Sequence, residues 1–345
     1  MKWGSFGRSG LKVSELCLGT MTLAGQADEK TSYAILDTAF EGGIRFFDTA
    51  DCYPIPLSLA TGGDSEALVG RWARERGVRD EIVIASKAYF PMGVLPLHCG
   101  NSRLHLTRAC EASLRRLNTE WIDLYLCHGW DETVPVDETL RALEDLRSDG
   151  KIAYAGLSNV RAHEVSASLV AATQLGLSGI DGLQPRYNVL LREAEESLFP
   201  LARRFGLGTM VYNPIAGGLL SGKYMPGENP TKGTRFALEG IGDVYRRRYW
   251  EERYLAEAQA LRQAAAEHDM SLVTAAVAWV LANDDVSSAI IGASRPEQLA
   301  DHLRATEVEL PAELKDRFDR VWFEIPRRPP ELDNPRIADF FNVQE

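Results

Sequence analysis

Three apolar runs of the sequence end in residues that could donate, hold or orient a proton. Asp48 ends IRFFD, Lys87 ends EIVIASK, His128 ends IDLYLCH, and Tyr53 follows Asp48 by five residues. Apolar residues stand two, or two and four, positions before each of the three strand-end residues. Phe46 precedes Asp48, Val83 and Ala85 precede Lys87, and Leu124 and Leu126 precede His128. Because residues two apart in a strand point to the same face, we expect these groups on one face at three strand ends.

The four groups form a consistent set for acid catalysis. A phenol with an ordinary pKa of about 10 is a poor acid at neutral pH, and a neighbouring ammonium lowers that pKa. We expect Lys87 to supply this charge and Asp48 to hold Lys87 protonated and in place. His128 could orient a carbonyl oxygen toward Tyr53. Pro54 disfavours the helical region at Tyr53 and helps to fix its turn.

Eight short β-rich runs alternate with longer segments of helical periodicity. The runs are 14–21, 44–50, 81–88, 122–128, 152–159, 182–188, 208–214 and 288–294. Apolar residues recur at i, i+3 and i+4 in segments such as 31–43, 65–77, 106–118, 136–150 and 194–206. Eight such units predict an α/β fold of the (β/α)8 TIM-barrel type, which takes about 250 residues and collects active-site groups at the C-terminal ends of its strands.

The competing fold is an open, doubly wound sheet. That fold usually carries a glycine-rich turn after its first strand, whereas here the first run is followed by TLAGQADEK. The GRSG at 7–10 precedes the first run and is better interpreted as the turn of an N-terminal hairpin. No repeat or linker divides the chain, so residues 1–345 are predicted to form one domain. Long connections at 52–66 and 215–249 are expected to be functional or mobile loops at the C-terminal face.

Composition limits the classes of function. The 345 residues carry a net charge of -11, which disfavours binding to nucleic acid. No run is long enough to span a membrane and the start has no secretory pattern, so a cytoplasmic protein is expected. Five cysteines without a CxxC pair argue for reduced thiols. His98, Cys99 and His105 could be drawn as metal ligands, but we expect a surface loop there and no metal.

Further motifs identify the chain as similar to the aldo-keto reductase family over nearly its full length. They are GRSGLKVSELCLGTM, FFDTADCY, IASK, DLYLCH, GLSN, LQPRYN, YNPIAGGLLSGKY and IIGASRPEQL. The resemblance implies NADPH-dependent reduction of a small-molecule carbonyl compound on a barrel, with Asp48, Tyr53, Lys87 and His128 as the catalytic tetrad. The insertion at 54–63 is similar to an extended loop in a subset of bacterial members.

The same resemblance implies a set of NADPH-binding residues. Ser158, Asn159 and Gln184 would bind the carboxamide, Tyr212 would stack on the nicotinamide, and Ser294 and Arg295 would take the 2'-phosphate, which favours NADPH over NADH. The full set is Gly19, Thr20, Asp48, Ser158, Asn159, Gln184, Tyr212, Asn213, Pro214, Ile215, Gly217, Gly218, Leu219, Lys223, Arg235, Gly292, Ser294, Arg295, Gln298 and His302. At the adenine contact, relatives commonly have Glu and Asn where this chain has Asp301 and His302.

Several residues have simpler interpretations. Arg295 could cap a helix or pair with Glu297. The run Arg246 to Arg248 could clamp a pyrophosphate, but a charge run is usually a solvated helix face, and we favour that interpretation. Cys52 and Cys127, each next to a tetrad residue, are expected to serve packing rather than redox chemistry.

The sequence says less about the substrate. The resemblance places Trp130 after the catalytic histidine, with Tyr89, Phe90, the 54–63 insertion and the C-terminal tail from 326 as further walls; Tyr89 and Trp130 are our predicted substrate residues. Three functions remain open: an aldehyde or ketone reductase, a ketosugar reductase of deoxysugar or natural-product biosynthesis, and an NADPH-binding module with slow turnover, like channel-associated members. Preferred direction and oligomeric state are not readable from the sequence.

Overall fold

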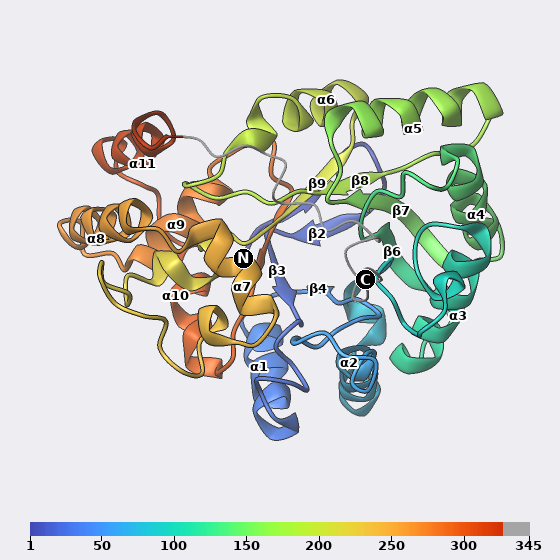
Figure 1. The fold of residues 1–345 in the computed structure, drawn as a ribbon, viewed down its shortest axis with the longest axis horizontal. Coiled ribbons are helices and arrows are strands. Elements are labelled where there is room, and N and C mark those ends of the chain that lie inside the picture. The colour runs from blue at the N-terminus through green and yellow to red at the C-terminus, as the bar shows by residue number, and fades with distance from the viewer. Residues whose placement is uncertain (327–345) are drawn as a thin grey trace, which may run out of the picture.

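The computed structural model describes residues 1–326, and within them eight parallel strands close into a barrel (Figure 1). The tail expected to wall the substrate site lies, from residue 327 on, outside the described residues. Each strand pairs with the next in the chain, and β10 returns to β3. The barrel strands are β3 (Leu16–Gly19), β4 (Phe46–Asp48), β5 (Val83–Ala88), β6 (Ile122–Cys127), β7 (Ile152–Ser158), β8 (Gly182–Gln184), β9 (Gly208–Tyr212) and β10 (Ser288–Ile291). The predicted barrel is confirmed.

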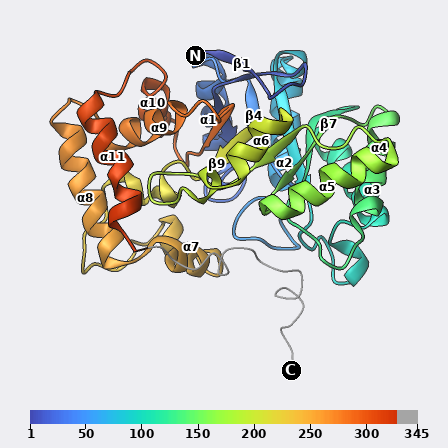
Figure 2. The ribbon, with the colours of Figure 1, turned by 90° about the horizontal axis from the view of Figure 1, so that it is seen from above.

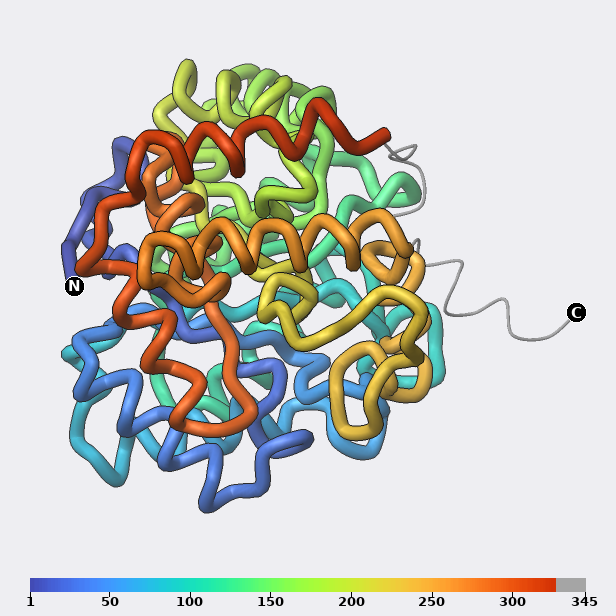
Figure 3. The backbone as a smooth tube through the Cα atoms, turned by 90° about the vertical axis from the view of Figure 1, so that its left-hand side faces the viewer, coloured from blue at the N-terminus to red at the C-terminus, as the bar shows by residue number. Residues whose placement is uncertain are grey.

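Helices surround the barrel, as Figures 1 and 3 show. Their bounds are α1 (Glu29–Glu41), α2 (Asp64–Arg76), α3 (Arg103–Leu117), α4 (Val136–Ser148), α5 (Ala162–Leu175), α6 (Leu198–Phe205), α7 (Ile241–Tyr249), α8 (Glu252–Ala266), α9 (Leu272–Leu281), α10 (Leu299–Arg304) and α11 (Ala312–Glu324). The five predicted helical segments fall on α1, α2, α3, α4 and α6. None of the described helices is long and apolar enough to cross a membrane.

A hairpin closes the N-terminal end of the barrel (Figure 2). Strands β1 (Trp3–Ser5) and β2 (Lys12–Ser14) pair antiparallel, and Phe6 N donates to Leu11 O across the turn, as predicted for GRSG. Phe6 packs under the barrel so closely that a Cβ at Gly182 or Gly208 would overlap its ring. Glycine is therefore required at both positions, and this end of the barrel is filled.

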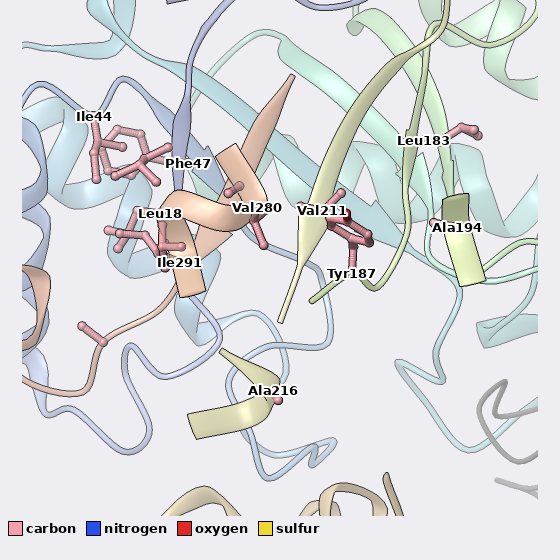
Figure 4. Close-up of a cluster of buried hydrophobic side chains, with 14 of the residues drawn as sticks. Leu18, Ile44, Phe47, Leu183, Tyr187, Ala194, Val211, Ala216, Val280 and Ile291 are labelled. Atoms are coloured by element: carbon pink, nitrogen blue, oxygen red, sulfur yellow. The ribbon is translucent and has the colours of Figure 1, made fainter. Parts of the chain in front are cut away.

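The barrel interior contains the residues predicted to share a face with the polar strand ends. Phe46, Ala85, Leu124 and Leu126 form an inner cluster with Phe6, Val13, Cys17, Met210 and Ile290. Residues of the opposite parity point outward and pack under the helices; Figure 4 labels Leu18, Phe47, Val211 and Ile291 among them, with Val280 of α9 nearby. Apolar side chains thus fill most of the interior, and the polar residues of the predicted site gather at the C-terminal rim.

One expectation about the loop before α3 was wrong. Cys99 and His105 are buried rather than on a surface loop, and His105 lies on the buried side of α3, next to Leu106. Burial lowers the pKa of His105 to about 4, so its imidazole is neutral. Within residues 1–326, no group of three or more His, Cys, Asp or Glu side chains could hold a metal ion.

Candidate active site

A cavity of about 940 Å³ opens at the C-terminal end of the barrel. Ligand sites usually measure about 300–1,000 Å³, so this cavity is large enough for an extended ligand. Its lining comes from the ends of β3, β4, β6, β7, β8, β9 and β10, from the loops after β4 and β5, and from the long segment after β9. Figure 2 shows α7 and the loop after β4 on the same side of the barrel, opposite the N-terminal hairpin.

An ion pair lies at the bottom of this cavity. Lys87 Nζ is 2.8 Å from Asp48 Oδ2 and donates a second hydrogen bond of 2.6 Å to Thr49 O. Gln184 Nε2 donates to the other carboxylate oxygen of Asp48 at 2.7 Å. Strands β4 and β5 are neighbours, and both side chains point inward from the C-terminal ends of these strands. Lys87 is completely buried, so the pair is shielded from water and held rigidly.

Tyr53 and His128 lie above the ion pair and line the cavity. Lys87 Nζ lies 5.0 Å from the centroid of the Tyr53 ring, and the Tyr53 and His128 ring centroids are 5.8 Å apart. Cys52 Sγ lies 4.0 Å from His128 Nδ1. The backbone of Tyr53 is anchored because its carbonyl oxygen accepts from Gly63 N at 3.0 Å, where the 54–63 loop returns to α2. The structure thus brings all four predicted tetrad residues together.

Burial controls the ionisation of these groups. Burial, and then the charge of Lys87, hold the pKa of His128 well below its usual value of about 6.5, so the imidazole is neutral. Burial also raises the pKa of Asp48, although the hydrogen bonds from Lys87 and Gln184 favour the carboxylate. A neutral imidazole can still donate a hydrogen bond to a carbonyl oxygen.

The expectation that Tyr53 would be more acidic than a free tyrosine is wrong for this structure. Burial first, and then the negative charge of Asp48, raise the pKa of Tyr53 well above 10. The physical reason is that the phenolate would lose its water, while the ammonium of Lys87 is already neutralised by its partner Asp48. Tyr53 therefore keeps its proton at neutral pH and can donate it only to a strong base.

A second set of polar residues lies at the ends of β7, β8 and β9. Tyr212 donates to Asn159 Oδ1 at 2.6 Å, and Asn159 Nδ2 donates to the carbonyl oxygen of His128 at 2.8 Å. Ser158 Oγ donates to Gln184 O at 3.0 Å. These bonds fix one wall of the cavity beside the tetrad, with amide and hydroxyl groups that could bind an amide-bearing ring.

The first residues after β9 form a tight turn along the cavity. Asn213, Ala216, Gly217 and Gly218 all have positive φ, and the ring of Tyr245 packs on Gly217 so closely that a Cβ there would lie 2.5 Å from it. Within this turn, Ala216 N donates to Asn213 O and Gly218 N donates to Ile215 O, each at 2.9 Å. These bonds hold the small residues of the segment against the cavity, where a side chain at Gly217 would not fit.

Cations of the cavity are concentrated on the same side. Lys223, Arg235 and Arg295 line it, and burial together with the two guanidinium charges lowers the pKa of Lys223. Like charges repel, so an anion between them would be stabilised by all three. Gln298 accepts from Ser294 N at 2.8 Å and closes this end of the cavity.

Comparison with known proteins supports the same interpretation. A family model described as the Aldo/keto reductase family matches residues 15–322. The chain belongs to the Aldo/keto reductase family. It is 34% identical to a "Probable voltage-gated potassium channel subunit beta" of Oryza sativa (95% of this chain, 98% of the relative). It is 35% identical to the "Uncharacterized oxidoreductase YrpG" of Bacillus subtilis (91% and 94%) and 32% identical to the "Aldo-keto reductase ausK" of Aspergillus calidoustus (88% and 77%).

Members of the aldo-keto reductase family are oxidoreductases that act on small-molecule carbonyl compounds and generally use nicotinamide cofactors. The residues of this chain fit such a cofactor. Two buried polar atoms of the lining, Asn213 Nδ2 and His302 Nδ1, have no partner among residues 1–326, as expected where a ligand completes the hydrogen bonding. The cluster of Lys223, Arg235 and Arg295 supplies positive charge for phosphates. A bound nicotinamide would supply the hydride for carbonyl reduction.

Most predicted cofactor residues line the cavity of this aldo-keto reductase, but two do not. Thr20 and Leu219 are completely buried behind the wall. Thr20 accepts a hydrogen bond from Ser65 Oγ at 2.9 Å, which ties β3 to α2. Those that do line it are Gly19, Asp48, Ser158, Asn159, Gln184, Tyr212, Asn213, Pro214, Ile215, Gly217, Gly218, Lys223, Arg235, Gly292, Ser294, Arg295, Gln298 and His302.

Both predicted substrate residues, Tyr89 and Trp130, lie outside the lining. Tyr89 is turned away because its phenol donates to Trp130 O at 3.0 Å and its ring fills the space that a Cβ on Gly129 would need. The next residue, Phe90, points the other way and lines the cavity. The alternation of side chains along an extended segment could have indicated that only one of the two aromatic residues would face the substrate.

Sequence reasoning also missed part of the lining. The additional residues include Met21, Thr22, Gln26, Tyr224, Ile241, Val244, Tyr245, Arg247 and Arg248, whereas Ile55 and Leu57 of the lining belong to the 54–63 insertion that was expected to form a wall. The favoured interpretation of the arginine run as a solvated face therefore holds only in part: Arg247 and Arg248 line the cavity, and Arg246 donates to Phe236 O. Amphipathic spacing in α7 was the available signal, since Ile241, Val244, Tyr245 and Arg248 recur at i, i+3, i+4 and i+7.

Proposed function

We propose that the chain reduces an aldehyde or ketone to the corresponding alcohol with NADPH, with Tyr53 as the proton donor. The observation that carries this proposal is the convergence of Tyr53, His128 and the buried Lys87–Asp48 pair at the bottom of one cavity. A general acid needs only to lie within hydrogen-bonding reach of the oxygen that it protonates. The phenol and the imidazole both line the space where that oxygen would lie.

Each side chain then has a separate task. The neutral imidazole of His128 donates a hydrogen bond to the carbonyl oxygen and polarises it. Once hydride has reached the carbon, the oxygen becomes an alkoxide, which is a base strong enough to take the proton of a phenol of high pKa. The ammonium of Lys87 lies 5.0 Å from the centroid of the Tyr53 ring and, although it is paired with Asp48, offsets part of the cost of the negative charge left on Tyr53. Asp48 keeps that ammonium in place.

Purified protein should oxidise NADPH in the presence of a panel of aldehydes and ketones. With NADPH carrying deuterium at both C4 positions of the nicotinamide, the label should appear on the carbinol carbon of the product, as read by mass spectrometry. Deuterium in the product, with one NADPH oxidised per alcohol formed, would support direct hydride transfer. Alcohol formation without label would contradict it.

The proposed preference for NADPH over NADH rests on the cluster of Lys223, Arg235 and Arg295 in the cavity lining. Arg295→Ala should weaken NADPH binding about 10- to 100-fold, because a charge-assisted hydrogen bond to a phosphate contributes about 1.5–3 kcal/mol. NADH, which lacks the 2'-phosphate, should bind about as before. Calorimetric titration of both cofactors measures this, with Arg304→Ala as a control, since Arg304 bonds to Asp269 O instead. Equal losses for the two cofactors would assign Arg295 to another part of the cofactor.

A second candidate is an NADPH-binding module with slow turnover. It is favoured by the similarity to two proteins named as probable voltage-gated potassium channel beta subunits, which covers nearly all of both chains. The two candidates differ in kinetics. A single burst of NADPH oxidation followed by stalled release would favour the module, whereas steady turnover many times the enzyme concentration would favour the reductase.

A further inference from the structure

The end of the cavity beside the tetrad is walled by apolar side chains. The ring centroid of Phe90 lies 4.8 Å from that of His128. Ile55 N donates to Met21 O at 3.0 Å, which places these two residues together on the loops after β3 and β4. Leu57 continues this wall toward the opening. A carbonyl group held between Tyr53 and His128 would therefore carry its remaining atoms against hydrocarbon and an aromatic ring.

Charged lining residues other than those of the tetrad come from a different part of the chain. Lys223, Arg235, Arg247, Arg248 and Arg295, together with Asp301, all follow β9 in sequence. Up to β9, apart from the tetrad, the lining contains only uncharged side chains. Lys223, Arg235 and Arg295 interact electrostatically with one another and form a cationic part suited to phosphates, whereas Arg248 lies near Tyr212 and Tyr245.

The apolar wall offers few hydrogen bonds to a polyhydroxylated substrate. Thr22 Oγ1 already donates to Ala293 O at 2.6 Å, and Phe90, Ile55 and Leu57 have no polar side-chain atoms. Hydroxyl groups removed from water without partners cost about 1–3 kcal/mol each. A ketosugar would incur this cost several times, whereas an apolar group would gain by burial.

The rim next to this wall is apolar as well. Leu57, Leu59, Val94, Leu95 and Leu97 are between 38% and 78% exposed and lie on the loops after β4 and β5. These loops pack directly against each other, since a Cβ on Gly62 would lie 3.1 Å from Met92 Cε. Exposed side chains of this size beside a cavity are typical of a binding site rather than of ordinary surface.

We propose that the 54–63 loop and Phe90 select an uncharged carbonyl compound with a large apolar group, such as a fused aromatic ring, and reject sugars. This inference rests on the proposed function and names its substrate class. The reaction is unchanged: the carbonyl carbon gains hydride from NADPH, the oxygen gains the proton of Tyr53, and NADPH becomes NADP⁺. Leu57 is a specificity-determining residue in this proposal, because it contacts the part of the substrate farthest from the carbonyl.

The test compares kcat/KM for matched acceptors. 2-Naphthaldehyde should exceed D-xylose and D-glyceraldehyde by at least about a hundredfold, and methyl 4-formylbenzoate should exceed 4-carboxybenzaldehyde, which carries a charge, by about tenfold. Preference for a sugar would overturn the proposal. Preference for the carboxylate would overturn it too, and would assign Arg247 or Arg248 to substrate binding.

A variant pair tests the wall itself. Leu57→Ser should lower the ratio of kcat/KM for 2-naphthaldehyde to that for glyoxal about tenfold, because several buried methyl and methylene contacts are lost. Val170→Ser, at an exposed position on α5, is the control for replacing an exposed aliphatic side chain by serine, and it should leave the ratio unchanged. A ratio that is unchanged in Leu57→Ser would contradict the role of the loop.

Measurements of ligand binding test the proposed substrate class independently of the proposed reductase activity. Calorimetry of the protein with NADP⁺ should detect 2-naphthamide, which cannot be reduced under these conditions, and should detect no D-xylitol at the same concentration. If the protein reduces no carbonyl compound, the proposed function fails, and the binding comparison still decides whether the wall selects apolar ligands. If it reduces sugars in a Tyr53-dependent reaction, the function stands and this inference fails.

Discussion

Replacement of Tyr53 by phenylalanine should lower kcat about 10²- to 10⁴-fold, which is the usual contribution of a general acid. The ring can stay where it is, because it packs over Lys87 Nζ and against His128 without needing the hydroxyl group. The variant lacks only the phenolic proton that Tyr53 would donate to the alkoxide. Because burial and Asp48 keep the phenol protonated, the wild-type rate should not fall from Tyr53 ionisation as pH rises from about 6 to about 9.

The matched control is Tyr33→Phe, which removes a hydroxyl group from α1 in the helical layer. This variant should keep kcat within about threefold of wild type, as expected for a surface change far from the chemistry. NADPH affinity, measured by titration, should be the same in both variants and in wild type. A Tyr53→Phe protein with full kcat would show that water or another side chain delivers the proton.

The position of the tetrad could be predicted from sequence because the barrel imposes strict geometry. Strand side chains alternate, so the inward set Phe46 and Asp48 follows from parity alone. All barrel strands are parallel, so their last residues meet at one rim. Asp48 and Lys87 are therefore brought within 2.8 Å although the local sequence of each says nothing about the other.

The ionisation of Tyr53 could not be predicted in the same way. The sequence motifs indicate that the ammonium of Lys87 lies near the phenol of Tyr53, and this proximity alone predicts a lowered pKa of Tyr53. The outcome depends on how much water reaches the phenol and on whether the ammonium already has a partner. Both are properties of the packed structure: Lys87 is completely buried and is bonded to Asp48.

Two aspartates of the motif FFDTADCY also differ in a way that the sequence did not predict. Asp48 and Asp51 are three residues apart, and both are buried. Asp48 points into the barrel and has Lys87 and Gln184 as partners, whereas within residues 1–326 neither carboxylate oxygen of Asp51 has a side-chain partner. Burial and the nearby charge of Glu66 raise the pKa of Asp51 well above its usual range. The spacing of the two residues did not indicate this difference.

Replacement of Lys87 by methionine should destabilise the fold as well as lower kcat. Removing one partner of a buried ion pair costs about 3–5 kcal/mol, because the other charge is left buried without compensation. The free energy of unfolding, measured with urea at about pH 8, should fall by this amount. kcat should fall about 10²- to 10³-fold, the usual effect of removing one electrostatic group that stabilises developing charge.

The loss of stability in Lys87→Met should depend on pH. Burial already raises the pKa of Asp48, and without Lys87 its main opposing interaction is gone. The folded variant then binds a proton more tightly than the unfolded chain, whose aspartate pKa is about 3.9, so its stability falls as pH rises above that value. Relative to wild type, the variant should therefore be less destabilised at about pH 5 than at about pH 8.

The double variant Asp48→Asn, Lys87→Met separates stability from catalysis. Both charges are absent, and the asparagine side chain keeps an oxygen that can accept the bond from Gln184 Nε2. Replacing a whole buried pair is often neutral for stability, so most of the free energy lost in Lys87→Met should return, and the dependence on pH should disappear. Activity should not return, because no ammonium lies below Tyr53. A double variant no more stable than Lys87→Met would show that the single substitution acts through packing. Recovery of activity would remove Lys87 from the mechanism.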